Sequence, residues 1–390
     1  MAEKERVLEA PSDLICLPRI SIKTYQLFEK LTELFRRFID FDDSLFYILA
    51  VVYVLLTYFY DIFDQVPYIQ VFGLKGSGKS LLGELFEGLC FSPFNSSEIS
   101  DASLYRAIDQ EYGGMTMIID EADDLGGPTR RGILLRVLRS GYRRHGNVTR
   151  CGPNGTVQRF STFCPKIIIN ERGIHDSALD TRTIPVHMIR SARSLEKFLS
   201  AKIGKEFKEV KDVIRSFSED YRDLVSDRYI SFKCVDGISG RDEEIWTPIF
   251  IIAEILDAGL AEPHVKQDMH KLAIKIIFQR RIKQLVENKD AQILESTCAY
   301  VGQVKPLDPH GLYVAEELWR FIKERCSLPD LKLETVSRIL NRYNIIKGVK
   351  RLRLGKEIRD REIEVQRSCY LIDREKLASL TEEYQGGEIL

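Results

Sequence analysis

The sequence predicts an α/β protein built on a parallel β-sheet with covering helices, followed by a smaller C-terminal unit. Three observations lead to this prediction. A glycine-rich octapeptide of the form G-x-x-x-x-G-K-S lies between a strand-like apolar run and a run with helical spacing. Two further apolar runs end in polar residues, as strands buried on both faces of a parallel sheet do. Near the C-terminus, two amphipathic helical segments precede two strand-like segments.

The octapeptide Gly73–Ser80 has the pattern of a phosphate-binding loop (P-loop). It follows the strand-like run Tyr68–Phe72 and precedes the helical run Leu81–Phe86, which is the context that the motif requires. Glycines let backbone N–H groups approach phosphate oxygens, and the helix start adds partial positive charge. We therefore expect ATP and Mg²⁺ as ligands. The residues predicted to bind nucleotide are Gly73, Lys75, Gly76, Ser77, Gly78, Lys79 and Ser80, with Ser80 also contacting Mg²⁺.

An acidic pair follows the next strand-like run, Met115–Ile119. Because ligands gather at the carboxyl ends of parallel strands, Asp120 is predicted to hold Mg²⁺, through water. Glu121 is predicted to act as the general base that deprotonates the attacking water. A solvated pair at a helix start is the alternative interpretation.

Composition limits the class of protein. The net charge is −1 with 29 % charged residues, so a nucleic-acid site would have to be local or repeated around an oligomer. The eight cysteines form no C-x-x-C pair, which favours reduced thiols and a cytoplasmic location.

The apolar run Leu45–Tyr60 is flanked by acids rather than basic anchors, so we expect a core helix and no membrane contact. Residues 1–60 are predicted to be a helical segment that packs on the core.

An arginine-rich block follows the acidic pair. No Asp or Glu occurs between Leu125 and Asn170, and the end of this stretch alternates as a β-hairpin does, with Gly152–Gly155 at the turn. A local basic hairpin is suited to DNA phosphates. The residues predicted to contact nucleic acid here are Arg143, Arg144, Arg150, Asn154 and Arg159.

The order of several short motifs resembles that of a family of AAA-type P-loop ATPases found in bacteria, archaea, phages and plasmids, often beside or fused to primases. The motifs are Thr57–Asp61, Val66–Tyr68, the P-loop, Asp120–Asp123, Ser140–Arg144, Phe160–Lys166 and Arg241–Phe250. The resemblance implies an ATPase core over residues 61–193 and a helical lid over residues 194–301. The P-loop departs from many members of the family, which carry bulkier residues where Gly76–Gly78 stands here.

The resemblance also implies roles for three residues. Asn170, which ends the strand-like run after the hairpin, corresponds to the sensor that helps to place the attacking water. Arg182 lies where such ATPases present an arginine finger to the neighbouring subunit, whose transferring phosphoryl group it stabilises. Arg241, at the start of a lid helix, is the second sensor and would reach the γ-phosphate of its own site. For both arginines, a surface ion pair with nearby acids is the alternative.

Residues 306–390 have the profile of a winged helix, in which helix, helix and hairpin follow one another. Lys350, Arg351 and Arg353 in the hairpin are predicted to contact DNA phosphates without reading sequence. Protein docking is the other common use of this module.

Together these features predict an oligomeric ATPase, with a hexameric ring as the expected assembly, that translocates on or unwinds DNA during replication of a chromosome or mobile element. A primase or another replication protein is the expected protein partner. The alternative is an ATPase that remodels or loads a replication or defence protein, with the arginines at subunit interfaces. A monomeric nucleotide-dependent switch, in which Arg182 would be dispensable, is a third interpretation.

Overall fold

The computed structural model describes residues 22–96, 114–120, 134–151, 156–174, 176–233, 235–358 and 361–385. The chain consists of two compact units, Met1–Ile276 and Ile277–Leu390. The division falls within helix α9 (Val265–Glu287).

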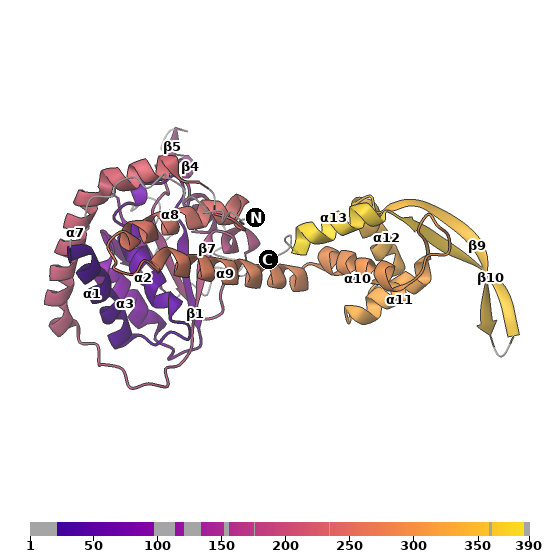
Figure 1. Cartoon of the computed structure of the whole chain (residues 1–390), viewed down its shortest axis with the longest axis horizontal. Coiled ribbons are helices and arrows are strands. Elements are labelled where there is room, and N and C mark those ends of the chain that lie inside the picture. Colours follow the sequence, from indigo (N-terminus) through magenta and orange to yellow (C-terminus); the bar gives the residue numbers. More distant parts are fainter. Residues whose placement is uncertain are drawn as a thin grey trace, which may run out of the picture. The chain divides into compact units, whose positions relative to one another are not determined.

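A five-stranded parallel sheet lies at the centre of the first unit and confirms the predicted α/β class (Figure 1). Its order is β2-β3-β6-β1-β7. All residues of β3 and β6 are buried, which explains why these segments are nearly continuous apolar runs. The strands are β1 (Tyr68–Gly73), β2 (Pro93–Ser96), β3 (Thr116–Ile119), β6 (Lys166–Asn170) and β7 (Thr183–Met188).

Sequence analysis did not identify the two edge strands. β7 pairs only with β1, and it contains Pro185, which lacks the N–H that a central strand would need. β2 is four residues long and begins with Pro93, so it has almost no periodicity to detect. Both segments are strands because of their hydrogen bonds to a neighbouring strand, and their own sequences give little indication of it.

Helices of the first unit surround this sheet (Figure 1). The run Leu45–Tyr60 forms α2 and the turn after it, and ten of the twelve residues of α2 are buried. Within the described residues, no helix is long and apolar enough to cross a membrane. The helices are α1 (Ile22–Phe38), α2 (Leu45–Leu56), the 3₁₀ turn η1 (Tyr60–Ile62), α3 (Lys79–Leu89), α5 (Leu134–Ser140), α6 (Ser177–Asp180), α7 (Ser200–Ser231), α8 (Gly240–Asp257) and α9.

The predicted β-hairpin is present as β4 (Asn147–Cys151) and β5 (Val157–Ser161). The two strands pair antiparallel from Asn147 opposite Ser161 to Cys151 opposite Val157. The turn residues 152–155, among them Asn154, lie outside the described residues.

The second unit combines helices with a three-stranded sheet of order β8-β10-β9. Helix α10 (Lys289–Gln303) falls largely in the range that the sequence assigned to the lid. Its buried residues pack with those of α11 and α12, so α10 belongs to the second unit. Strands β9 and β10 form a long ribbon that extends away from the helices of the unit (Figure 1). Its elements are α10, β8 (Leu312–Val314), α11 (Ala315–Arg325), α12 (Leu333–Arg342), β9 (Ile346–Ile358), β10 (Arg361–Ile372) and α13 (Arg374–Gln385).

A fully buried lysine joins the two ends of the hairpin segment to the sheet. The Lys166 ammonium donates to the carbonyl oxygens of Thr162 at 2.8 Å, Cys164 at 3.0 Å and Gly141 at 3.3 Å. It also lies 4.9 Å from the centre of the Tyr68 ring. Burial lowers the pKa of this amine, and the three carbonyls and the ring compensate part of the cost of burying its charge.

We expect Lys166→Met to destabilise the first unit by about 2 kcal/mol or more, because it leaves buried carbonyl oxygens without a donor. Urea unfolding measures the effect. The exposed Lys202→Met change on α7 is the control, with an effect within about 0.5 kcal/mol. Equal stability of the two variants would contradict the anchoring role of Lys166.

Candidate active site

The P-loop joins β1 to α3 with the backbone geometry that its glycines permit. Gly76 and Gly78 have φ angles of 78° and 90°, in the left-handed region that favours glycine. Helix α3 begins at Lys79, immediately after Gly78. The unsatisfied N–H groups of its first turn therefore lie next to the loop, where an anion is stabilised.

Two polar side chains of the loop are positioned to interact with phosphate. The Lys79 ammonium donates to the carbonyl oxygens of Gly73 at 2.7 Å and Leu74 at 3.0 Å, so it lies folded over the loop. The Ser77 hydroxyl is buried and has no hydrogen-bond partner in the described part of the chain. Phosphate oxygens are acceptors that both groups can use.

Asn170 and Asp120 lie at the same carboxyl edge of the sheet as the P-loop. Asn170 ends β6 directly beside Phe72 of β1, one residue before the loop. Asp120 follows Ile119, which pairs with Ile168 of the same strand β6. The three strands are neighbours, so Asp120 is two strand spacings, about 10 Å, from β1.

The Asn170 side chain is held in place by a local contact. Its Oδ1 accepts from the backbone N–H of Gly173 at 3.1 Å, and the residue is buried. The amide nitrogen of such a fixed side chain can orient a water, which suits the sensor role that sequence analysis gave it. Glu121, the predicted general base, lies outside the described residues.

The donors at this edge fit Mg²⁺. Ser80 is exposed in the first turn of α3, and the carboxylate of Asp120, which follows β3, is of the hard oxygen type that Mg²⁺ prefers. Mg²⁺ retains several waters and shares ligands with nucleotide phosphates, so it needs no closed protein cage. Among the described residues, no cluster of three His, Cys, Asp or Glu side chains forms such a cage.

Arg182 lies at the opposite, amino edge of the sheet. It directly precedes β7, and its carbonyl oxygen accepts from the N–H of Tyr68, the first residue of β1, at 3.1 Å. Six residues of strand, about 20 Å, separate it from Met188 at the P-loop edge. Arg182 therefore cannot reach the nucleotide bound by its own P-loop.

Arg241, at the start of α8, lies at this amino edge as well. The guanidinium carbons of Arg182 and Arg241 lie 4.8 Å and 5.6 Å from the centre of the Tyr142 ring. The Tyr142 carbonyl accepts from the N–H of Val66, just before β1, at 2.8 Å. Arg241 therefore lies at the opposite edge of the sheet from its own P-loop, and its predicted contact with its own γ-phosphate stays a prediction.

The Arg182 guanidinium is only partly satisfied. Within the described part of the chain, its Nε and Nη1 are buried without a hydrogen-bond partner. Burial and the nearby positive charge of Arg241 lower the pKa of the Arg182 guanidinium. The Asp176 carboxylate, whose pKa the Arg182 charge helps to lower, forms its ion pair with Arg139 and caps α6. An incoming anion would supply the acceptors that the two Arg182 nitrogens lack.

Two arginines predicted to contact DNA have partners within the protein. Arg143 forms an ion pair with Glu244 at 3.0 Å. Arg144 forms an ion pair with Asp64 at 3.1 Å and donates to the carbonyl oxygens of Phe63 and Asp61. These contacts connect the start of the hairpin segment to the core and to α8, so the charges of these arginines are already neutralised.

The other predicted nucleic-acid residues lie on the two hairpins. Arg159 is exposed on β5 opposite Thr149, and the backbone of Arg150 pairs with that of Gln158. On β9, Arg351 and Arg353 are exposed and form no ion pair with any residue in the described part of the chain. Lys350 lies 3.9 Å from an Asp308 carboxylate oxygen, a weak contact that leaves it accessible.

Sequence analysis missed one basic residue at the P-loop. A methyl group built on Gly76 would lie 3.1 Å from Nη2 of Arg190, so this guanidinium lies against the loop. Arg190 follows β7, a strand that sequence analysis did not identify, and no motif marks it.

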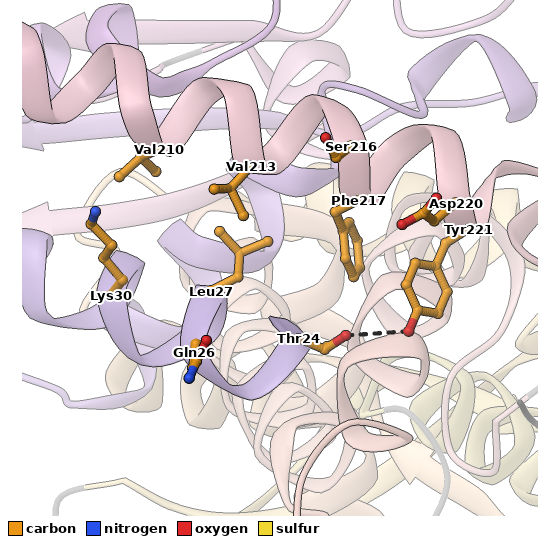
Figure 2. A pocket seen from close by; sticks show the side chains of 10 residues that line it. All are labelled: Thr24, Gln26, Leu27, Lys30, Val210, Val213, Ser216, Phe217, Asp220 and Tyr221. Carbon is orange, nitrogen blue, oxygen red and sulfur yellow. Dashed lines mark hydrogen bonds between the residues drawn. The ribbon is translucent and has the colours of Figure 1, made fainter. Parts of the chain in front are cut away.

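A cavity of about 380 Å³ lies away from the P-loop, between α1 and α7 (Figure 2). Apolar and polar side chains line it together, and Thr24 and Tyr221 share a 3.2 Å hydrogen bond at one end. A second cleft, of about 570 Å³, lies beside Arg241 and is lined in part by Glu243 and Tyr229. Neither cavity includes a residue of the P-loop.

No protein-family model and no curated protein matches the sequence. The apo C-terminal region of NrS-1 aligns at 14 % identity over 92 % of this chain and 76 % of that chain, with a TM-score of 0.38. The active helicase Cch of SCCmec type IV aligns at 13 % identity over 95 % and 72 %, with a TM-score of 0.42. Aeropyrum pernix ORC1 in complex with DNA aligns at 13 % identity over 86 % and 91 %, with a TM-score of 0.24.

Because Arg144 is bonded within the protein, we expect Arg144→Ala to lower the free energy of unfolding by about 1 kcal/mol. Thermal unfolding of the whole chain measures the effect. Arg136→Ala, a change at an exposed position of α5, is the charge-matched control and should leave stability nearly unchanged. An Arg144→Ala protein with the same free energy of unfolding as the wild type would show that these contacts do not stabilise the fold.

Proposed function

We propose that the protein hydrolyses ATP at the carboxyl edge of the parallel sheet. The observation that carries the proposal is the convergence of the P-loop, Asn170 and Asp120 from three neighbouring strands. Lys79 binds the β- and γ-phosphates, and Ser80 and Asp120 hold Mg²⁺. Asn170 orients the attacking water and Glu121 accepts its proton. Mg²⁺, when bound, neutralises the charge that develops on the phosphoryl oxygens.

We further propose that the site is completed by a second copy of the chain. Arg182 and Arg241 lie at the edge opposite their own P-loop, so both would act in trans on the nucleotide of a neighbouring subunit. The two unpartnered nitrogens of Arg182 are supporting evidence, because a phosphoryl group supplies the acceptors that the described residues do not. A closed ring, a hexamer by resemblance, gives each P-loop such a neighbour.

DNA is the proposed substrate of the motor, which would be a helicase or translocase. Support comes from the exposed Arg159 on the β4–β5 hairpin and from Arg351 and Arg353 on β9. We propose that the C-terminal unit is a winged helix, since α10, β8, α11, α12 and the β9–β10 ribbon follow the order of that module. Residues 61–193 would be the ATPase core, with α7 and α8 as its lid.

Remodelling or loading of a replication or defence protein is the second candidate function. It is favoured by the intramolecular ion pairs of Arg143 and Arg144, which leave the arginine-rich block fewer charges for DNA. A primase or another replication protein is the partner to test first.

The proposal is tested by the steady-state rate of ATP hydrolysis with and without single-stranded and duplex DNA, at two salt concentrations. We expect Lys79→Ala to abolish hydrolysis, because phosphate binding is lost. We expect DNA to stimulate the wild type in a salt-sensitive way, and Arg159→Ala to weaken that stimulation. Arg136→Ala is the charge-matched control. Absence of stimulation by any nucleic acid would favour the remodelling function.

A mixing experiment distinguishes cis from trans roles. We expect Arg182→Ala and Arg241→Ala each to reduce hydrolysis strongly, since each removes transition-state stabilisation. Mixing either variant with Glu121→Gln protein should restore activity, because an intact P-loop then meets an intact arginine across the interface. Rescue of Arg182→Ala without rescue of Arg241→Ala would assign Arg241 to its own site. Failure of both in assembled oligomers would exclude the trans site.

A further inference from the structure

The segment that leaves β7 lies against the P-loop glycines. A methyl group on Gly73 would lie 2.1 Å from the Met188 carbonyl oxygen, and one on Gly78 would lie 3.7 Å from the Met188 side chain. The face of Gly76 is covered by the Arg190 guanidinium, whose Nη2 would lie 3.1 Å from such a methyl group. The loop and this segment therefore form one surface.

Among the residues that the structure describes, Arg190 has no partner of its own. It is exposed, and within the described residues it forms neither an ion pair nor a hydrogen bond through its side chain. Arg193, three residues further on, contrasts with it, because its guanidinium is bonded to the Asp40 carboxylate and the Tyr47 hydroxyl. One arginine of the segment thus anchors it to the core, and the other is left beside the loop.

We infer that Arg190 binds the phosphates of the nucleotide held by its own P-loop. The inference rests on the proposed ATP site and adds a residue to it. A guanidinium offers a planar set of donors that matches two phosphate oxygens at once, whereas Lys79 acts as a single point charge. The buried, unpartnered Ser77 hydroxyl in the same loop is a second group that an anion there would satisfy.

This assignment supplies the cis arginine that sequence analysis expected at Arg241. The Lys79 ammonium is hydrogen-bonded to carbonyl oxygens of the P-loop. The guanidinium group of Arg190 lies against Gly76 of the same loop. Arg190 is exposed, so it can turn toward the ligand without disturbing the packed sheet. It is a binding residue for the phosphates, whereas Met188 only positions the loop.

The test is calorimetric titration of the full chain with ATP, ADP and adenosine. Arg190→Ala should weaken ATP binding about tenfold or more, the loss expected for a charge-assisted hydrogen bond, and should weaken ADP binding as well. Adenosine, which has no phosphate, should bind to the variant as to the wild type. Arg190→Lys should recover part of the affinity for ATP. Lys197→Ala removes an exposed charge from the same segment and should leave all three affinities unchanged.

Unchanged ATP affinity in Arg190→Ala would overturn the inference, and so would an equal loss for adenosine, which would indicate a general distortion of the site. The proposed function fails in a different way. A wild type that does not bind ATP, or a Lys79→Ala variant that binds it normally, would remove the P-loop assignment itself.

Discussion

Much of the first unit depends on one buried positive charge. The Lys166 ammonium holds carbonyl oxygens from Gly141 and Thr162, the two ends of the segment that contains the β4–β5 hairpin. Lys166 begins β6, which ends at Asn170 on the carboxyl edge of the sheet. The ring of Tyr142, which follows Gly141, lies next to the guanidinium groups of both Arg182 and Arg241. The same contact therefore fixes the base of the hairpin, the start of β6 and the residue that precedes this ring. A hydrophobic residue could fill this space, but it could not hold three carbonyl groups in register.

The carboxyl and amino edges of the parallel sheet carry different kinds of polar groups. Its carboxyl edge collects backbone N–H groups, hydroxyls and a carboxylate, which suit a phosphate and its metal. Its amino edge collects guanidinium groups, of which Arg143 and Arg144 are paired with carboxylates, whereas two nitrogens of Arg182 have no hydrogen-bond partner among the described residues. In the proposed function, one edge carries the binding half of a site and the other edge carries the charge-stabilising half, so a second copy of the chain completes it.

Sequence alone predicted the elements whose patterns are strong and local. The P-loop, the strands β1, β3 and β6, and the β4–β5 hairpin all follow from apolar runs and turn residues. β2 and β7 could not be predicted, because Pro93 and Pro185 interrupt their periodicity and their identity depends on the strand beside them. The positions of Arg182, Arg190 and Arg241 depend on β7 and on long-range packing. Motif order could therefore single out Arg182 and Arg241 but not Arg190, and it could not indicate at which edge of the sheet each arginine lies.

The short strand β7 begins beside one arginine and ends just before another. In a ring, these two ends would touch different nucleotides, one bound by a neighbour and one bound by the same chain. A hydrogen-bonded strand does not stretch, so a shift of the P-loop on nucleotide binding would be passed along its length as a displacement of Arg182. Reciprocity of coupled binding then requires that the neighbour's nucleotide influence the first site by the same free energy. Communication between subunits would thus need no moving domain, only a rigid rod about 20 Å long.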